Sequence, residues 1–230
     1  MNTMKVLIAC EESQTVTKEF RKLGFEAFSC DIQDCSGGHP EWHIKGDAIN
    51  EAYSGKYDLM IAHPPCTHIA QAGGRWFERK RLDGSQRDAL IFFTKLCAAP
   101  IKLKAVENPK GILSSDWYIQ KHFPEIMNFL SCHKLPRKPD QKLHPYHFGD
   151  PKQKETHFWL FGLPKLEHTE VVEPEQHRGV ITRKGNYRPG STRPMTWLDF
   201  ATPKEKSKTF PGIAAAMANQ WGNFLKEITQ

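Results

Sequence analysis

The strongest constraint on the fold is a series of short apolar runs that alternate with helical patterns. Continuous apolar runs are typical of buried strands in a parallel sheet. They cover residues 6–10, 25–30, 57–63, 101–107 and 157–161. Helical periodicity follows at 16–23, 85–97, 117–132 and in an Ala-rich stretch at 213–228. This alternation predicts a doubly wound α/β sheet.

Polar residues with catalytic or binding potential stand at the ends of these runs. Glu11, Asp31, Cys66 and Glu107 each follow or close a predicted strand. In open α/β sheets, ligands bind beyond the carboxyl ends of the strands. We therefore expect the functional site at that edge.

Composition excludes several classes of protein. Hydrophobic residues make up 39% of the 230 residues, and no stretch approaches the ~18 apolar residues of a membrane span. The first residues predict a strand rather than a signal peptide. Six scattered cysteines without a CxxC pair indicate a reducing cytoplasm and no disulfides. The net charge of +6 suits a polyanionic partner without proving one.

A cysteine held by two prolines follows the third run, in Pro64-Pro65-Cys66-Thr67. A thiol on such a rigid turn could be a nucleophile, if a neighbouring group activates it. A structural cysteine in a proline turn fits this motif equally well.

A glutamate closes the fourth run, in Glu107-Asn108-Pro109. Flanking apolar residues predict partial burial and a raised pKa, which suits a carboxyl group that donates or shares a proton. The alternative is a surface glutamate that caps the next helix.

Together the two motifs resemble the PCQ and ENV motifs of cytosine-C5 DNA methyltransferases, and the chain is most similar to a compact phage and prophage subgroup. Further elements match that family in order across nearly the whole chain. They are Lys5–Ser13, Asp31, Gly46-Asp47-Ala48, Gln153–Gly162 and Thr209–Ala218. The resemblance implies a Rossmann-like, S-adenosylmethionine-dependent methyltransferase fold, with double-stranded DNA as substrate and no metal.

The resemblance also implies roles for individual residues. Cys66 attacks C6 of a flipped cytosine, Glu107 hydrogen-bonds N3 and the amino group, Asn108 holds Glu107, and C5 takes the methyl group to give 5-methylcytosine. The implied cofactor-binding residues are Cys10, Glu11, Ser13, Asp31, Ile32, Asp47, Ala48 and Pro64. The implied DNA-binding residues are Pro65, Thr67, Arg75, Lys152, Lys154, Arg183 and Arg188.

The chain departs from the family pattern at several points. The first loop has Cys10-Glu11-Glu12-Ser13 instead of glycines, and Thr67 replaces Gln. Glu155 and His157 stand where the family has arginines. We expect a catalytic core at 1–162, a short irregular target-recognition region at 163–206, and a helix at 207–230 that returns to the core.

Segments near the predicted site have two possible readings each. The Gly- and Arg-rich stretch 73–81 is either a loop that closes over the base or a solvated basic face before a helix. The basic residues of 178–193 suit DNA contact but also any exposed loop. We expect Trp117, Tyr118 and Phe123 in the core, and Trp42 near the adenine of the cofactor.

Other functions stay open. Cys30, Cys35, His39 and His43 are a conceivable zinc site with an unusual spacing, which we consider less probable than a loop over the cofactor. The same catalytic residues would serve an RNA cytosine methyltransferase. An inactive relative that binds DNA or a protein, and a Rossmann-like enzyme acting on free nucleotides, are further alternatives.

Overall fold

We describe a computed structural model of the chain, which covers residues 4–135, 137–175 and 201–228. In this part of the chain, strands form a seven-stranded sheet with the order β3-β2-β1-β4-β5-β7-β6. The strands are β1 (Lys5–Ala9), β2 (Glu26–Asp31), β3 (His43–Lys45), β4 (Leu59–Ala62), β5 (Leu103–Pro109), β6 (Gln141–Leu143) and β7 (Thr156–Phe161). All five predicted strands are present. The two that were missed, β3 and β6, are three residues long, which is too short for a periodicity signal.

Strand direction defines the fold. β3, β2, β1, β4 and β5 pair in parallel, whereas β7 pairs antiparallel with both β5 and β6. The strand order reverses between β1 and β4, which creates a crevice at their carboxyl ends. The predicted doubly wound α/β fold is confirmed, with β7 as its antiparallel strand.

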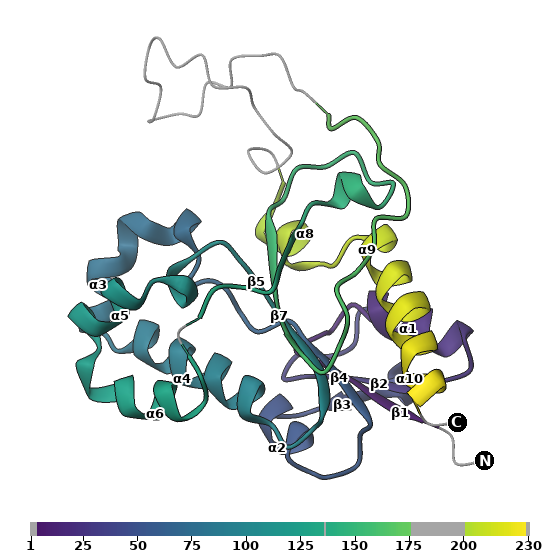
Figure 1. The fold of residues 1–230 in the computed structure, drawn as a ribbon, viewed down its shortest axis with the longest axis horizontal. Helices are drawn as coiled ribbons and strands as arrows, with labels where there is room; N and C mark the ends of the chain where they lie inside the picture. The colour runs from purple at the N-terminus through teal and green to yellow at the C-terminus, as the bar shows by residue number, and fades with distance from the viewer. Residues whose placement is uncertain (1–3, 136, 176–200, 229–230) are drawn as a thin grey trace.

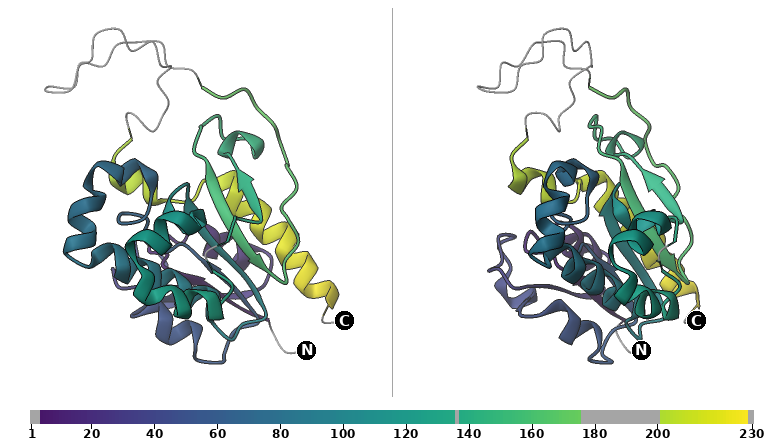
Figure 2. Two further views of the ribbon diagram at one scale, coloured as in Figure 1. Left: turned by 60° about the vertical axis from the view of Figure 1, so that its left-hand side comes forward. Right: turned by 90° about the vertical axis from the view of Figure 1, so that its left-hand side faces the viewer.

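Helices cover both faces of the sheet (Figures 1 and 2). They are α1 (Thr15–Lys22), α2 (Ala48–Ala52), α3 (Phe77–Leu82), α4 (Ser85–Ala98), α5 (Asp116–His122), α6 (Met127–Cys132), α8 (Pro203–Ser207), α9 (Pro211–Ala216) and α10 (Gly222–Ile228). On one face Phe93 of α4 packs edge-on against Trp159 of β7. On the other face Trp221 packs edge-on against Phe158. Each face therefore has its own buried core.

The predicted C-terminal helix returns to the sheet. α9 and α10 are joined by a π-helical turn at Met217–Trp221 and lie beside α1 (Figure 1). A side chain at Gly212 would place its Cβ 1.8 Å from the carbonyl oxygen of Phe148, so only glycine allows this close approach. The indole of Trp221 donates to the carbonyl of Pro164 at 2.9 Å, which ties the segment after β7 to the same core.

Side chains along β5 point alternately to the two faces of the sheet, and this alternation determines the faces on which Glu107 and Asn108 lie. Ala105 belongs to the core under α1 and α9, and Val106 to the core under α4. Side chains of successive strand residues point to opposite faces. Glu107 therefore lies on the α9 face, where it shares a small cavity with Phe158 and Ile213, and Asn108 lies on the other.

Candidate functional site

Two adjoining cavities lie at the carboxyl ends of β1, β2 and β4. The larger has a volume of about 650 Å³ and the smaller about 530 Å³. They share Cys10, Asp31, Gln33 and Pro65. The larger extends past Cys66, and the smaller toward α2 and α4. Both lie at the predicted edge of the sheet, within the size range of about 300–1,000 Å³ typical of small-molecule sites.

The loop after β1 is tight although it lacks glycines. Cys10 and Gln14 have φ angles of 60° and 56°, the left-handed region that costs an L-residue of order 1 kcal/mol or more. Gln14 is buried, and its side-chain amide donates to the carbonyl of His39 at 2.8 Å and accepts from the amide of His39 at 3.1 Å. Gln14, which the sequence did not single out, thus holds the loop after β2 against the loop after β1.

Glu11 accepts hydrogen bonds that connect this loop to the first turn of α1. Its carboxylate accepts hydrogen bonds from the backbone of Val16 at 2.7 Å and from the hydroxyl of Thr17 at 2.7 Å. These bonds satisfy free amides at the first turn of α1. Burial raises the pKa of Glu11, and these hydrogen bonds oppose the rise. Glu11 also borders the larger cavity, but its polar atoms are used by the protein.

Most of the other expected cofactor residues surround the two cavities. Asp31, Ile32, Asp47 and Ala48 line the smaller cavity together with the apolar side chain of Phe92, and Ser13 lines the larger. Asp31 at the end of β2 and Asp47 before α2 place two carboxylates beside an apolar wall. This arrangement suits a nucleoside, because its ribose hydroxyls can donate to a carboxylate and the flat faces of its base are apolar. The residues present therefore fit an adenosyl group.

The prolines before Cys66 have different positions from those implied. Pro65 lines both cavities, whereas Pro64 lines neither. The carbonyl of Pro64 instead accepts a hydrogen bond from the side-chain amide of Asn108 at 3.0 Å. Asn108 is 1% exposed. This single bond ties the turn that carries Cys66 to the end of the strand that carries Glu107.

Cys66 is partly buried and lines the larger cavity. Burial raises the pKa of its thiol, and the negative charge of Glu107 raises it further. Lys154 and Lys80 act in the opposite direction. All six cysteines are free.

A histidine that the sequence analysis did not single out adjoins Glu107. His63 Nδ1 lies 3.3 Å from Glu107 Oε2, and the two side chains are 8% and 14% exposed. His63 Nε2 and Glu107 Oε1 are buried without a partner among the described residues. His63 also borders the larger cavity. It is the polar residue that ends the third apolar run, so its place in the sequence could have identified it.

The expected rise in the pKa of Glu107 is wrong in direction. Burial acts to raise it, as predicted, but the hydrogen bond from His63 and the charges of Lys154, His63 and His157 outweigh burial. The net result is a pKa below the ordinary value. Glu107 is thus a buried carboxylate stabilised by cationic neighbours.

The expected DNA-binding residues fall into several groups. Thr67 lines the larger cavity, and Lys154 lines the small cavity beside Glu107. Lys152 forms an ion pair with Glu175, and the Arg75 guanidinium lies 5.0 Å from the ring centre of Trp76. Arg183 and Arg188 lie outside the described residues. Lys206 and Lys208, which the sequence analysis did not assign, also border the larger cavity.

The structure also shows the surroundings of three aromatic residues whose positions were predicted from the sequence, Trp42, Trp117 and Phe123. Trp42 stacks on His39 at 3.8 Å and lines a separate pocket beside α1 rather than either of the two site cavities. Trp117 is 66% exposed, which corrects its expected place in the core. Phe123 is buried as expected.

The four conceivable zinc ligands do not converge. The Cys35 thiol donates to Gln14, His39 pairs with Glu41, and His43 contacts Ser29 and the carbonyl of Gln33. Within the described ranges, no group of three or more His, Cys, Asp or Glu side chains could hold a metal ion.

No protein-family model and no curated protein sequence matches the chain. Solved structures with a similar backbone include a candidate DNA modification methyltransferase encoded within a prophage of Escherichia coli, with 13% identity and a TM-score of 0.43 over 69% of this chain and 46% of that one. Another is a methyltransferase from Entamoeba histolytica, with 13% identity and a TM-score of 0.45 over 79% of this chain and 62% of that one. The chain spans about half of the first protein and less than two thirds of the second. Of the helices described, none has the length and apolar content needed to cross a bilayer.

Proposed function

We propose that the chain is an S-adenosylmethionine-dependent DNA cytosine-C5 methyltransferase with Cys66 as nucleophile. The observation that carries the proposal is the convergence of Cys66, Glu107 and His63 from two adjacent strand ends beside a cavity of about 650 Å³. A thiol supplies the covalent bond to C6, and a buried pair of proton-holding groups supplies the charge stabilisation that attack on a pyrimidine requires.

The charges around the thiol suit a reaction that begins when substrate arrives. Burial and Glu107 disfavour the Cys66 thiolate in the free protein. A flipped cytosine whose amino group donates to Glu107 would reduce the negative charge that this carboxylate presents to Cys66 and so favour the thiolate. Lys154, whose ammonium donates to the carbonyl of Lys206 at 2.8 Å, keeps a positive charge beside both groups.

His63 is the source of a proton that this reaction requires. When the Cys66 sulfur bonds to C6, electron density moves onto N3 of the base, which then needs a proton. A carboxylate with a lowered pKa has none to give, and it can only accept. In its contact with Glu107 Oε2, His63 therefore holds the hydrogen at Nδ1. We assign the pair as the proton source: a doubly protonated His63 passes its Nδ1 hydrogen through Glu107 to N3 and is left as a neutral imidazole.

The methyl donor would be held by Asp31, Asp47 and the apolar wall of the smaller cavity. Its sulfonium supplies an electrophilic methyl group, which C5 takes as a neutral thioether leaves. Loss of the C5 proton to a base in the site, with departure of the Cys66 sulfur from C6, then restores the ring as 5-methylcytosine. DNA as the polymer accords with the net charge of +6 and with the lysines that border the cavity.

A trapping experiment tests the proposal. The protein is mixed with S-adenosylmethionine and a pool of random-sequence duplex DNA in which 5-fluorocytosine replaces cytosine. Fluorine cannot leave C5 as a proton does, so the reaction stalls as a covalent adduct. We expect a denaturation-resistant protein–DNA band with the native chain and with Cys132→Ala, whose cysteine is exposed on α6, and none with Cys66→Ala.

Each other outcome rejects part of the proposal. A band that persists with Cys66→Ala excludes Cys66 as nucleophile. A band with a matching RNA pool and none with DNA transfers the activity to RNA. Absence of a band together with absence of S-adenosylmethionine binding excludes the methyltransferase.

A further inference from the structure

A third cavity, of about 450 Å³, lies on the opposite face of the sheet from Glu107 and has no role in the chemistry above. Its walls come from five separate segments of the chain. They are the start of α3 (Phe77), the turn after β5 (Lys110), α5 (Tyr118), β6 with the residues before it (Lys138, Lys142) and β7 (His157).

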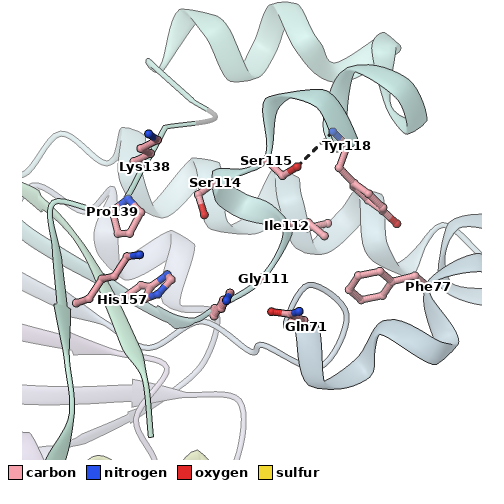
Figure 3. Close-up of a pocket in the computed structure, with 12 residues that line it drawn as sticks. Gln71, Phe77, Gly111, Ile112, Ser114, Ser115, Tyr118, Lys138, Pro139 and His157 are labelled. Atoms are coloured by element: carbon pink, nitrogen blue, oxygen red, sulfur yellow. Dashed lines mark hydrogen bonds between the residues drawn. The ribbon is translucent and has the colours of Figure 1, made fainter.

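The cavity has two chemically different sides. Figure 3 shows Phe77 and Tyr118 on one side and Lys138, Pro139 and His157 on the other. The two rings lie 5.8 Å apart. Tyr118 is held in place because its hydroxyl donates to Gln86 at 3.0 Å and accepts from Arg81 at 2.6 Å. An aromatic wall facing a basic wall suits a nucleotide, which has a flat base and an anionic phosphate.

The basic side carries cations that no described residue pairs. Lys110, Lys138 and Lys142 are exposed. No hydrogen bond or ion pair joins their ammonium groups to another residue in the described ranges. Glu155 is the nearby acid, and its carboxylate interacts most strongly with His157. The lysines therefore leave a net positive charge at this wall.

A buried imidazole completes the cavity. His157 is 3% exposed, and its Nε2 lies 2.6 Å from Glu155 Oε1. With Nε2 bonded to this carboxylate, Nδ1 is the ring atom left to exchange a hydrogen bond with a bound group. Nδ1 is buried without a partner among the described residues. An unpaired buried polar atom is destabilising, and a polar group on the edge of a base would satisfy it.

Two exposed aromatic residues directly precede the two residues of the aromatic wall in the chain. Trp76 precedes Phe77 and is 49% exposed, and Trp117 precedes Tyr118 and is 66% exposed. Each carries a cation near its ring, Arg75 at 5.0 Å and Lys121 at 4.9 Å. Exposed rings beside cations are typical of surfaces that stack bases.

The cavity is joined to the segment that carries Cys66. The backbone of Gln71 donates to the carbonyl of Lys110 at 2.9 Å, and that of Ile112 to Ile69 at 3.0 Å. A Cβ at Gly111 would lie 2.1 Å from the carbonyl oxygen of Ile69, so glycine is needed for this approach. The segment that follows Cys66 therefore forms part of the wall of the third cavity through Gln71.

We propose that this cavity binds an unpaired nucleotide of the DNA that carries the target cytosine, with its base against Phe77 and Tyr118 and its phosphate on Lys110, Lys138 and Lys142. The inference rests on the proposed function for its choice of DNA. It adds a second nucleotide site to the one at Cys66.

Binding measurements separate this proposal from catalysis. Fluorescence anisotropy with short labelled duplexes, intact or with one unpaired 2-aminopurine, is measured across salt concentrations for the native chain and for the triple variant Lys110→Gln, Lys138→Gln, Lys142→Gln. We expect the triple variant to bind at least tenfold more weakly at low salt. The slope of log K against log salt should fall by about 0.9 for each lost phosphate contact. Lys102→Gln is the matched control, because Lys102 is exposed at the opposite end of the segment that forms β5.

A second readout tests the base. Stacking on the aromatic wall should change the fluorescence of the unpaired 2-aminopurine, and Phe77→Leu should reduce that change with little effect on the salt slope. The proposal is overturned if the triple variant keeps the native affinity and slope, or if a matching RNA responds and DNA does not. Cys66→Ala should bind like the native chain, so a failure of methyl transfer leaves this result intact.

Discussion

The Nδ1 atom of His63 and the Oε2 atom of Glu107 face each other at 3.3 Å across the carboxyl ends of the adjacent strands β4 and β5. Their outer atoms, Nε2 and Oε1, have no partner among the described residues. Each side chain of this buried pair has one polar atom in the contact and one without a described partner. Such a pair is suited to hold a proton and to present it to a third group.

Replacing His63 should impair the proton step more than binding. We expect His63→Gln to lower kcat by roughly 10²-fold or more, in the range typical of general acid–base groups, with little change in KM for DNA. Gln can hydrogen-bond Glu107 but cannot titrate, so the limb of the pH–rate profile due to the pair should flatten. His133→Gln, at a partly exposed position directly after α6, is the control. An unaltered profile in His63→Gln would show that His63 is only structural.

The reactivity of Cys66 should follow the charges beside it. Glu107 raises the pKa of the thiol and Lys154 lowers it. Alkylation of Cys66 by iodoacetamide at neutral pH, followed by mass spectrometry of its peptide, should be about threefold faster or more in Glu107→Gln and slower by a similar factor in Lys154→Met. The rate at the exposed Cys132 of the same samples is the internal reference. Equal rates at Cys66 in the two variants would contradict the assigned charges.

Stability should depend on pH through Glu107. Its pKa is lower in the folded chain than in the unfolded chain, so its ionised form stabilises the fold at pH values above the unfolded pKa of about 4.3. This contribution is lost as the pH falls through the folded-state pKa. Urea unfolding should show Glu107→Gln to be less stable than the native chain at pH 7, with a difference that shrinks below about pH 4. A difference that grows on acidification would refute the lowered pKa.

Glu11 should matter for stability because it caps α1. Its carboxylate accepts from the backbone of Val16 and from both the backbone and the hydroxyl of Thr17. We expect Glu11→Ala to lower the free energy of unfolding by about 1–3 kcal/mol. Glu19→Ala, on the same helix but paired only with the exposed Lys22, should change it by about 0.5 kcal/mol or less. Equal effects would remove the capping role.

The sequence predicted the sheet well because its strands are buried on both faces. A run such as Val6–Ala9 is fully buried, and burial on both faces requires the uninterrupted apolar residues that the analysis detected. The same logic placed Cys66 and Glu107 at one edge, since both follow such runs. Edge strands and short helices lack this signature, so β3, β6 and α2 were missed.

Side-chain partnerships were harder to predict. The direction of the pKa shift at Glu107 depends on His63, Lys154 and His157, which come from segments distant in the sequence. Flanking apolar residues revealed the burial of Glu107 but not its neighbours. Likewise the role of Glu11 depends on how closely α1 approaches the end of β1, a tertiary distance that no spacing rule supplies.

Both outermost strands of the sheet, β3 and β6, have three residues each, and each presents an exposed lysine, Lys45 and Lys142. Unpaired strand edges are templates for aggregation, and short, lysine-bearing edges are a common protection against it. The five longer, more apolar strands are enclosed between them. Two molecules of this protein should therefore resist joining edge to edge, even at the high concentrations used for crystallisation or NMR.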